Sequence, residues 1–119
     1  MLSDPLILAA MRQHHLFARL PEAAFQEVCS LAIQRRLENG ERLFHQGEPA
    51  NRFYLVMQGQ IKLSRVLAEG QEKLVEVIQP GQSFAEALLF SGARQYPVTA
   101  SALKATTLAS IDGAHYRHL

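Results

Sequence analysis

The spacing of apolar residues along the chain changes near residue 32, from a helical to a strand-like repeat. In the first segment, positions for one helix face recur at i, i+4, i+7 and i+8, namely Ile7, Met11, His14 and His15. Ser3-Asp4-Pro5 precedes them, and a capping side chain followed by proline in the first turn is typical of a helix start. The pattern therefore predicts a first helix that carries two histidines on one face.

A second helix is predicted to open at Pro21, with Glu22 in its first turn, where the helix dipole favours a carboxylate. Its apolar positions recur at helical spacing: Phe25, Val28, Cys29 and Ala32. Cys29 lies on this apolar face, and we interpret it as a packing residue. Residues 1–32 are therefore assigned to two N-terminal helices.

From residue 33 onward, short apolar or alternating runs are separated by glycines at a spacing of roughly ten residues, which is typical of successive short strands. The predicted strands are 33–37, 42–45, 53–57, 60–66, 73–78, 98–103 and 107–111. Turn chemistry separates them, for example at Glu38-Asn39-Gly40 and Glu69-Gly70-Gln71. So many short strands predict a mainly β fold over 33–111, closed as a jelly-roll β-barrel, because closure leaves few exposed edges.

Residues 112–119 begin like a helix that stops as soon as it starts. They indicate the start of a C-terminal helix, in a polypeptide that was cut there or whose natural form continues. We expect one domain over 1–119, since 119 residues fall within the usual size of a single domain.

The charge and the cysteine content limit which partners and which cellular compartment are expected for this chain. Twelve basic and eleven acidic residues give a net charge of +1, and no basic run is longer than Arg35-Arg36, so we expect no specific DNA binding by this chain alone. The single Cys29 cannot form an internal disulfide, which is typical of a reducing cytoplasm. The apolar start lacks a basic flank and is broken by Arg12, so neither a signal peptide nor a membrane partner is expected.

The most informative segment runs from Pro80 to Ala100 and reads as a tight turn, a short helix and a return strand. We name its chemistry-bearing residues the cassette: Phe84, Ala85, Glu86, Ala87, Arg94 and Gln95. Glu86 is predicted at the helix N-terminus, where unpaired N–H groups favour an anion, with Arg94 across from it. A carboxylate that accepts from hydroxyls and a guanidinium that grips a phosphate match a ribose phosphate, so the cassette predicts a small-molecule effector pocket.

This order of elements resembles the sensor domain of the cyclic-AMP receptor/fumarate-nitrate regulator (CRP/FNR) family of bacterial transcription factors. The residues that carry the resemblance are Gly40, Phe44-His45-Gln46-Gly47-Glu48, Phe53-Tyr54-Leu55-Val56, Gly59, Lys62, Gly70-Gln71-Glu72, Phe84-Ala85-Glu86-Ala87 and Arg94. The resemblance implies an effector-sensing domain whose full-length protein is a homodimer that binds operator DNA. It also implies that Glu86 takes a ribose hydroxyl and Arg94 a cyclic phosphate.

The cassette departs from the cyclic-AMP-binding pattern at Ala85, where glycine is expected, at Gln95, where serine is expected, and in a shorter span from Glu86 to Arg94. A Cβ at position 85 would crowd a phosphate or penalise a positive φ. Cyclic AMP is therefore the second candidate effector, and a regulatory module of a kinase or channel is a further alternative.

A finer similarity is to the denitrification branch of the family, the dissimilative nitrate respiration regulators. It is carried by Gly70-Gln71-Glu72-Lys73, by the cassette with Phe90, and by His14-His15-Leu16-Phe17. This resemblance implies haem as a cofactor, nitric oxide as the signal, and His14 or His15 as the iron ligand. Leu16, Phe17, Leu20 and Phe25 are the expected apolar wall, and His45 is the next candidate ligand.

An enzyme is not expected. Metal-dependent cupins share a β-roll, but they bind metal through a His-x-His pair that this sequence lacks. The sequence also offers no Ser-His-Asp or Cys-His constellation with supporting motifs, so no catalytic residue is assigned.

Overall fold

The computed structural model describes residues 4–118, apart from the side chains of Leu89 and Phe90. Its helices are α1 (Pro5–Gln13), α2 (Glu22–Leu31), α3 (Leu88–Ser91) and α4 (Gly113–Arg117). Its strands are β1 (Ile33–Leu37), β2 (Arg42–Phe44), β3 (Arg52–Gln58), β4 (Ile61–Val66), β5 (Glu72–Ile78), β6 (Ser83–Phe84), β7 (Thr99–Ala102) and β8 (Thr106–Asp112). No helix of residues 4–118 is long and apolar enough to cross a membrane.

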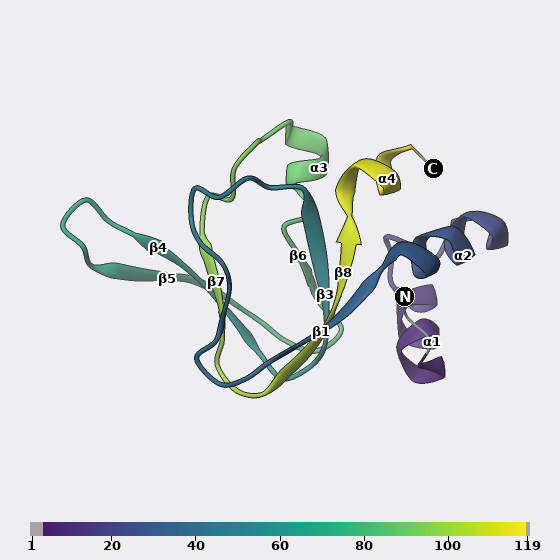
Figure 1. The fold of residues 1–119 in the computed structure, drawn as a ribbon, viewed down its shortest axis with the longest axis horizontal. Helices are drawn as coiled ribbons and strands as arrows, with labels where there is room; N and C mark the ends of the chain where they lie inside the picture. Colours follow the sequence, from purple (N-terminus) through teal and green to yellow (C-terminus); the bar gives the residue numbers. More distant parts are fainter. Residues whose placement is uncertain (1–3, 119) are drawn as a thin grey trace.

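The strands form two four-stranded antiparallel sheets, which confirms the mainly β jelly-roll prediction. One sheet has the order β1-β8-β3-β6 and the other β2-β7-β4-β5. Figure 1 shows α1 and α2 gathered on one side of the roll, while the hairpin of β4 and β5 projects on the opposite side. Helix α4 leaves the end of β8 on the side of α2.

Two cores hold the fold together. The first lies between the N-terminal helices and the sheet of β3 and β8, and is centred on Phe17 and Phe53, whose rings stack at 6.3 Å. The second fills the roll between the two sheets, and includes Val56 and Leu108 from one sheet and Ile61 from the other. The N-terminal helices are thus anchored on a packed roll.

Helix α1 ends at Gln13, two residues before the last position of the predicted helix face, His15. Asp4 caps it as expected, with its Oδ1 accepting from the N–H of Leu6 at 2.9 Å. His14 is the C-cap, with extended backbone angles (φ −68°, ψ 140°), and His15 follows in a turn. The prediction of two histidines on one helix face was therefore wrong, because the chain turns after Gln13 to insert Phe17 into the first core.

Gly59, in the turn between β3 and β4, has the tightest surroundings of the glycines in the described segment. Its φ is +91°, and a Cβ there would lie 2.5 Å from the carbonyl oxygen of Ala105 and 2.7 Å from the Cα of Thr106. Only glycine fits this close approach of two backbones.

Candidate effector site

The cassette begins on a strand that the sequence pattern did not predict. Ser83 and Phe84 form β6, which pairs with β3 through Tyr54 and Leu55. The side chain of Phe84 is buried in the roll and stacks on Tyr54 at 5.2 Å. Two residues give too little alternation for a strand to be read from sequence.

Ala85 has φ +69° and is the only residue other than glycine with a positive φ among residues 4–118. Such a conformation costs a side-chain-bearing residue about 1–2 kcal/mol. The methyl group of Ala85 packs against both cores. The cassette therefore keeps a backbone suited to glycine while a methyl group occupies the space that glycine would leave.

Glu86 lies in the turn before α3, and its Oε2 is buried without a hydrogen-bond partner in the described part of the chain. The side chain of Arg94 is exposed, while its carbonyl oxygen accepts from the N–H of Ala50 at 2.9 Å. Gln95 forms a β-bridge with Pro49. The ion pairs found among residues 4–118 do not join Glu86 to Arg94.

The interior of the roll next to the cassette is filled by aromatic side chains. Phe44 stacks on Tyr96 at 3.7 Å and on Tyr54 at 5.8 Å. The hydroxyl of Tyr96 donates to the carbonyl oxygen of Arg52 at 2.9 Å. Burial, followed by hydrogen bonding to Tyr96, raises the pKa of Tyr54, so its hydroxyl stays neutral.

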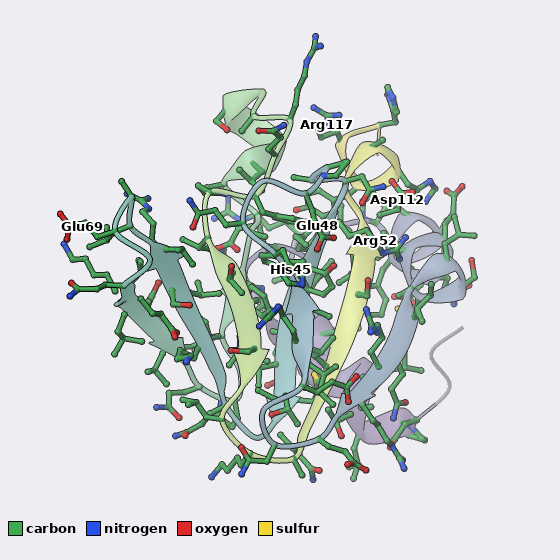
Figure 2. The ribbon with its side chains drawn as sticks, turned by 60° about the vertical axis from the view of Figure 1, so that its left-hand side comes forward. His45, Glu48, Arg52, Glu69, Asp112 and Arg117 are labelled. Atoms are coloured by element: carbon green, nitrogen blue, oxygen red, sulfur yellow. The ribbon has the colours of Figure 1, made fainter. Side chains whose placement is uncertain are left out.

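A cavity of about 120 Å³ lies between the cassette and helix α4, which leaves the roll after β8 and is therefore named the exit helix. It is lined by Ala50, Asn51, Arg52, Ala85, Leu88, Ala93, Gly113, Ala114 and Arg117. Figure 2 shows Arg52, Asp112 and Arg117 at this end of the molecule. Ligand pockets commonly measure about 300–1,000 Å³, so this cavity is small for a nucleotide.

Helix α4 is fastened to the roll and to the N-terminal segment. Asp112 caps it through the N–H of His115, and the N–H of Gly113 donates to the carbonyl oxygen of Asn51 at 2.9 Å. The hydroxyl of Tyr116 donates to the carbonyl oxygen of Leu16 at 2.5 Å. The sequence pattern assigned no role to Tyr116, because its partner lies 100 residues away.

His14 and His15 differ in their surroundings. His14 is half-buried and borders a cavity of about 320 Å³ together with Ala10, Leu55 and Met57, whereas His15 is exposed. The two rings lie 4.3 Å apart. Burial and the neighbouring His15 lower the pKa of His14, although the nearby charge of Glu86 opposes the shift.

The Nδ1 of His14 accepts from the N–H of Leu16 at 3.2 Å. Burial lowers the pKa of His14, so its ring is neutral near pH 7. A neutral imidazole carries one proton, and that proton is therefore on Nε2.

The expected apolar wall is arranged differently from the prediction. Phe17 and Phe25 are buried in the first core, where Phe53 and Tyr116 pack directly against Phe17. Side chains of this chain therefore fill the space beside that wall. No group of three or more His, Cys, Asp or Glu side chains in residues 4–118 could hold a metal ion, and His45 is exposed on the far sheet.

Comparison with known proteins gives a consistent assignment. Residues 34–119 match the cyclic nucleotide-binding domain family. The crystal structure of the sensor domain of the transcriptional regulator DNR from Pseudomonas aeruginosa is similar with a TM-score of 0.91 and 34% identity, over 95% of this chain and 75% of that one. The cyclic AMP receptor protein of Thermus thermophilus is 36% identical over 86 residues, which are 71% of this chain and 39% of that protein.

The global nitrogen regulator of Synechococcus elongatus is 37% identical over 59 residues, which are 50% of this chain and 27% of that protein. The chain thus spans well under half the length of these curated relatives. The family match covers most of the chain and agrees with the two-sheet roll, the cassette and the exit helix. This chain belongs to the cyclic nucleotide-binding domain family, as a member of its CRP/FNR group.

Proposed function

We propose that this chain is the effector-sensing domain of a bacterial CRP/FNR-type transcription regulator, which in its full length is a homodimer that binds operator DNA. The similarity to three bacterial regulators supports the proposal. In this role the roll binds a small molecule, and α4 transmits its presence to the DNA-binding part. The effector acts through its different affinities for two arrangements of that helix.

The observation that carries the proposal is a pair of hydrogen bonds at Leu16. Its N–H donates to the Nδ1 of His14, and its carbonyl oxygen accepts from the hydroxyl of Tyr116 on α4. The backbone of Leu16 therefore connects His14, a candidate residue for binding the effector, with the exit helix. Any change in what His14 binds reaches α4 through two bonds.

We propose further that the effector is nitric oxide and that it is sensed through haem, with His14 as the ligand of the iron. The neutral, half-buried imidazole of His14 and the cavity beside it fit such a ligand better than the exposed His15. Haem iron, when bound, supplies the coordination site for the gas.

In this proposal, the position of the proton on the His14 ring couples haem binding to helix α4. Were His14 to hold the iron through Nε2, the proton of its neutral ring would have to lie on Nδ1. Nδ1 could then no longer accept from the N–H of Leu16. Loss of that bond would let Leu16 shift, together with its contact to the hydroxyl of Tyr116.

The visible absorption spectrum of the purified chain with added haem tests this proposal. We expect a Soret band that responds to nitric oxide, that His14→Ala shifts or abolishes, and that His15→Ala leaves in place. The His15 variant is the matched control, because it removes an adjacent imidazole that is exposed. An unchanged spectrum in His14→Ala would exclude this ligand, and His45→Ala would then be measured.

Cyclic AMP is the second candidate, supported by the family match and by the unpartnered carboxylate oxygen of Glu86. We expect it to bind feebly, since Ala85 and the aromatic filling of the roll leave little space and the contact of phosphate with Arg94 is lost. A charge-assisted contact contributes about 1.5–3 kcal/mol, so its loss should weaken binding by roughly one to two orders of magnitude. Calorimetry that gives micromolar affinity, abolished by Arg94→Ala, would restore the nucleotide assignment.

A further inference from the structure

A second concave site lies on the outer face of the sheet β2-β7-β4-β5, away from the cassette. It is a cleft of about 430 Å³. Its lining residues are Asn39, Gly40, Arg42, His45, Lys62, Ser64, Val66, Glu72, Thr99, Ser101, Ala102 and Leu103. None of them lines the cavity at the exit helix, so the two sites are separate. In Figure 2, His45 lies between the hairpin tip marked by Glu69 and the group of Arg52, Asp112 and Arg117.

The register of the sheet places two cations on either side of a hydroxyl. Arg42 of β2 and Lys62 of β4 both pair with Ser101 of β7, so the three residues form one row across adjacent strands. Neighbouring strands lie about 4.8 Å apart, so the backbones of Arg42 and Lys62 are about 10 Å apart. Both side chains are long enough to converge over Ser101.

A second row supplies more hydroxyl groups. Thr99 pairs with Ser64, next to the first row along the same strands. The Oγ1 of Thr99 accepts from the N–H of Gln46 at 2.9 Å, which leaves its O–H available as a donor. The floor of the cleft therefore offers donors between two positive side chains.

The cleft already holds one carboxylate of its own chain. The Nζ of Lys62 lies 2.6 Å from the Oε1 of Glu72. Hydrogen bonds from Lys62 and from Ser64 lower the pKa of Glu72, and the charge of Arg42 acts in the same direction. The surroundings thus favour an oxyanion at this place.

One positive charge is left after that pairing. The ion pairs among residues 4–118 do not include Arg42. Its Nη1 instead lies 3.1 Å from the Nδ1 and 2.9 Å from the Nε2 of His45, of which only the nitrogen without a proton can accept. A guanidinium can grip a second oxyanion through two parallel bonds.

We propose that this cleft binds a small phosphate-type oxyanion, inorganic phosphate or a phosphomonoester, between Arg42 and Lys62 above Ser101, with Glu72 as a built-in competitor. The apolar side chains of Val66 and Leu103 border the cleft and give room for the organic part of an ester. The site is independent of the effector at the cassette.

Nuclear magnetic resonance titration of the ¹⁵N-labelled chain tests the proposal, with inorganic phosphate and with phenyl phosphate, at constant ionic strength maintained with chloride. We expect saturable shifts of the backbone amides of Ser64 and Ser101. Arg42→Gln should weaken the affinity about tenfold or more, and Glu72→Gln should tighten it about tenfold, because one charge-assisted contact is removed or one competitor is lost. Arg65→Gln is the matched control, since it removes an exposed arginine of β4, the strand of Lys62, that lies outside the cleft.

Tighter binding of phenyl phosphate than of inorganic phosphate identifies an ester as the preferred ligand, and equal affinities identify the free anion. Shifts that do not saturate, or that chloride reproduces, would overturn the proposal. So would an Arg42→Gln variant that binds as tightly as the Arg65→Gln control.

Discussion

Replacing Gly59 by alanine is expected to lower the free energy of unfolding by about 3 kcal/mol or more. A positive φ costs alanine about 1–2 kcal/mol, and forcing extra atoms into a filled space adds about 1–3 kcal/mol. The new Cβ would meet the backbone of Ala105 and Thr106, which is part of the turn into β8 and cannot move aside cheaply. Urea unfolding followed by far-ultraviolet circular dichroism measures the loss.

Gly70→Ala is the matched control for this prediction. Gly70 has φ +84°, close to the +91° of Gly59, but a Cβ there would meet no atom within 4 Å. The control therefore measures only the cost of the positive φ, and we expect the free energy of unfolding to fall by about 1–2 kcal/mol. Equal losses in the two variants would show that the close approach at Gly59 contributes nothing.

Replacing Phe17 by alanine is expected to cost about 3–5 kcal/mol, the range for truncating a fully buried phenylalanine. Its ring packs edge-on against Phe25 at 6.4 Å and Tyr116 at 5.9 Å, and stacks on Phe53 at 6.3 Å. The truncation removes the side chain that joins the N-terminal segment, β3 and α4. The same denaturation experiment should show a lower midpoint.

Leu6→Ala is the control for Phe17→Ala. Leu6 also lies in the N-terminal segment, but 81% of it is exposed, so its truncation should change the stability by no more than about 0.5 kcal/mol. A Phe17 variant as stable as the Leu6 variant would contradict the assignment of Phe17 to the centre of the first core.

Elements with a clear repeat could be predicted from the sequence. The strand predicted at 33–37 has those bounds in β1, and the helix predicted to open at Pro21 begins at Glu22. Where a contact with a distant part of the chain determines the backbone conformation, the hydrophobic repeat did not predict the end of the helix. His14 continues the helical spacing, yet it is the C-cap of α1, and the turn that follows places Phe17 in the first core.

The candidate site was only partly within reach of sequence reasoning. The argument that a side chain at position 85 would meet a positive φ agrees with the φ of +69° found there, because that property is local. The contact of Leu16 with Tyr116 and the row of Arg42, Ser101 and Lys62 depend on strand order and long-range packing. Neither leaves a periodic signal in the sequence.

The hydrogen bond from Tyr116 to Leu16 also has a consequence for biosynthesis. Its two partners are separated by 100 residues, so a ribosome that adds about 5–20 residues per second needs roughly 5–20 s between them. During this time α1 and α2 can form locally, but the loop that contains Leu16 has no partner on α4. The connection that is proposed to transmit the signal is therefore among the last contacts that residues 4–118 can complete during synthesis.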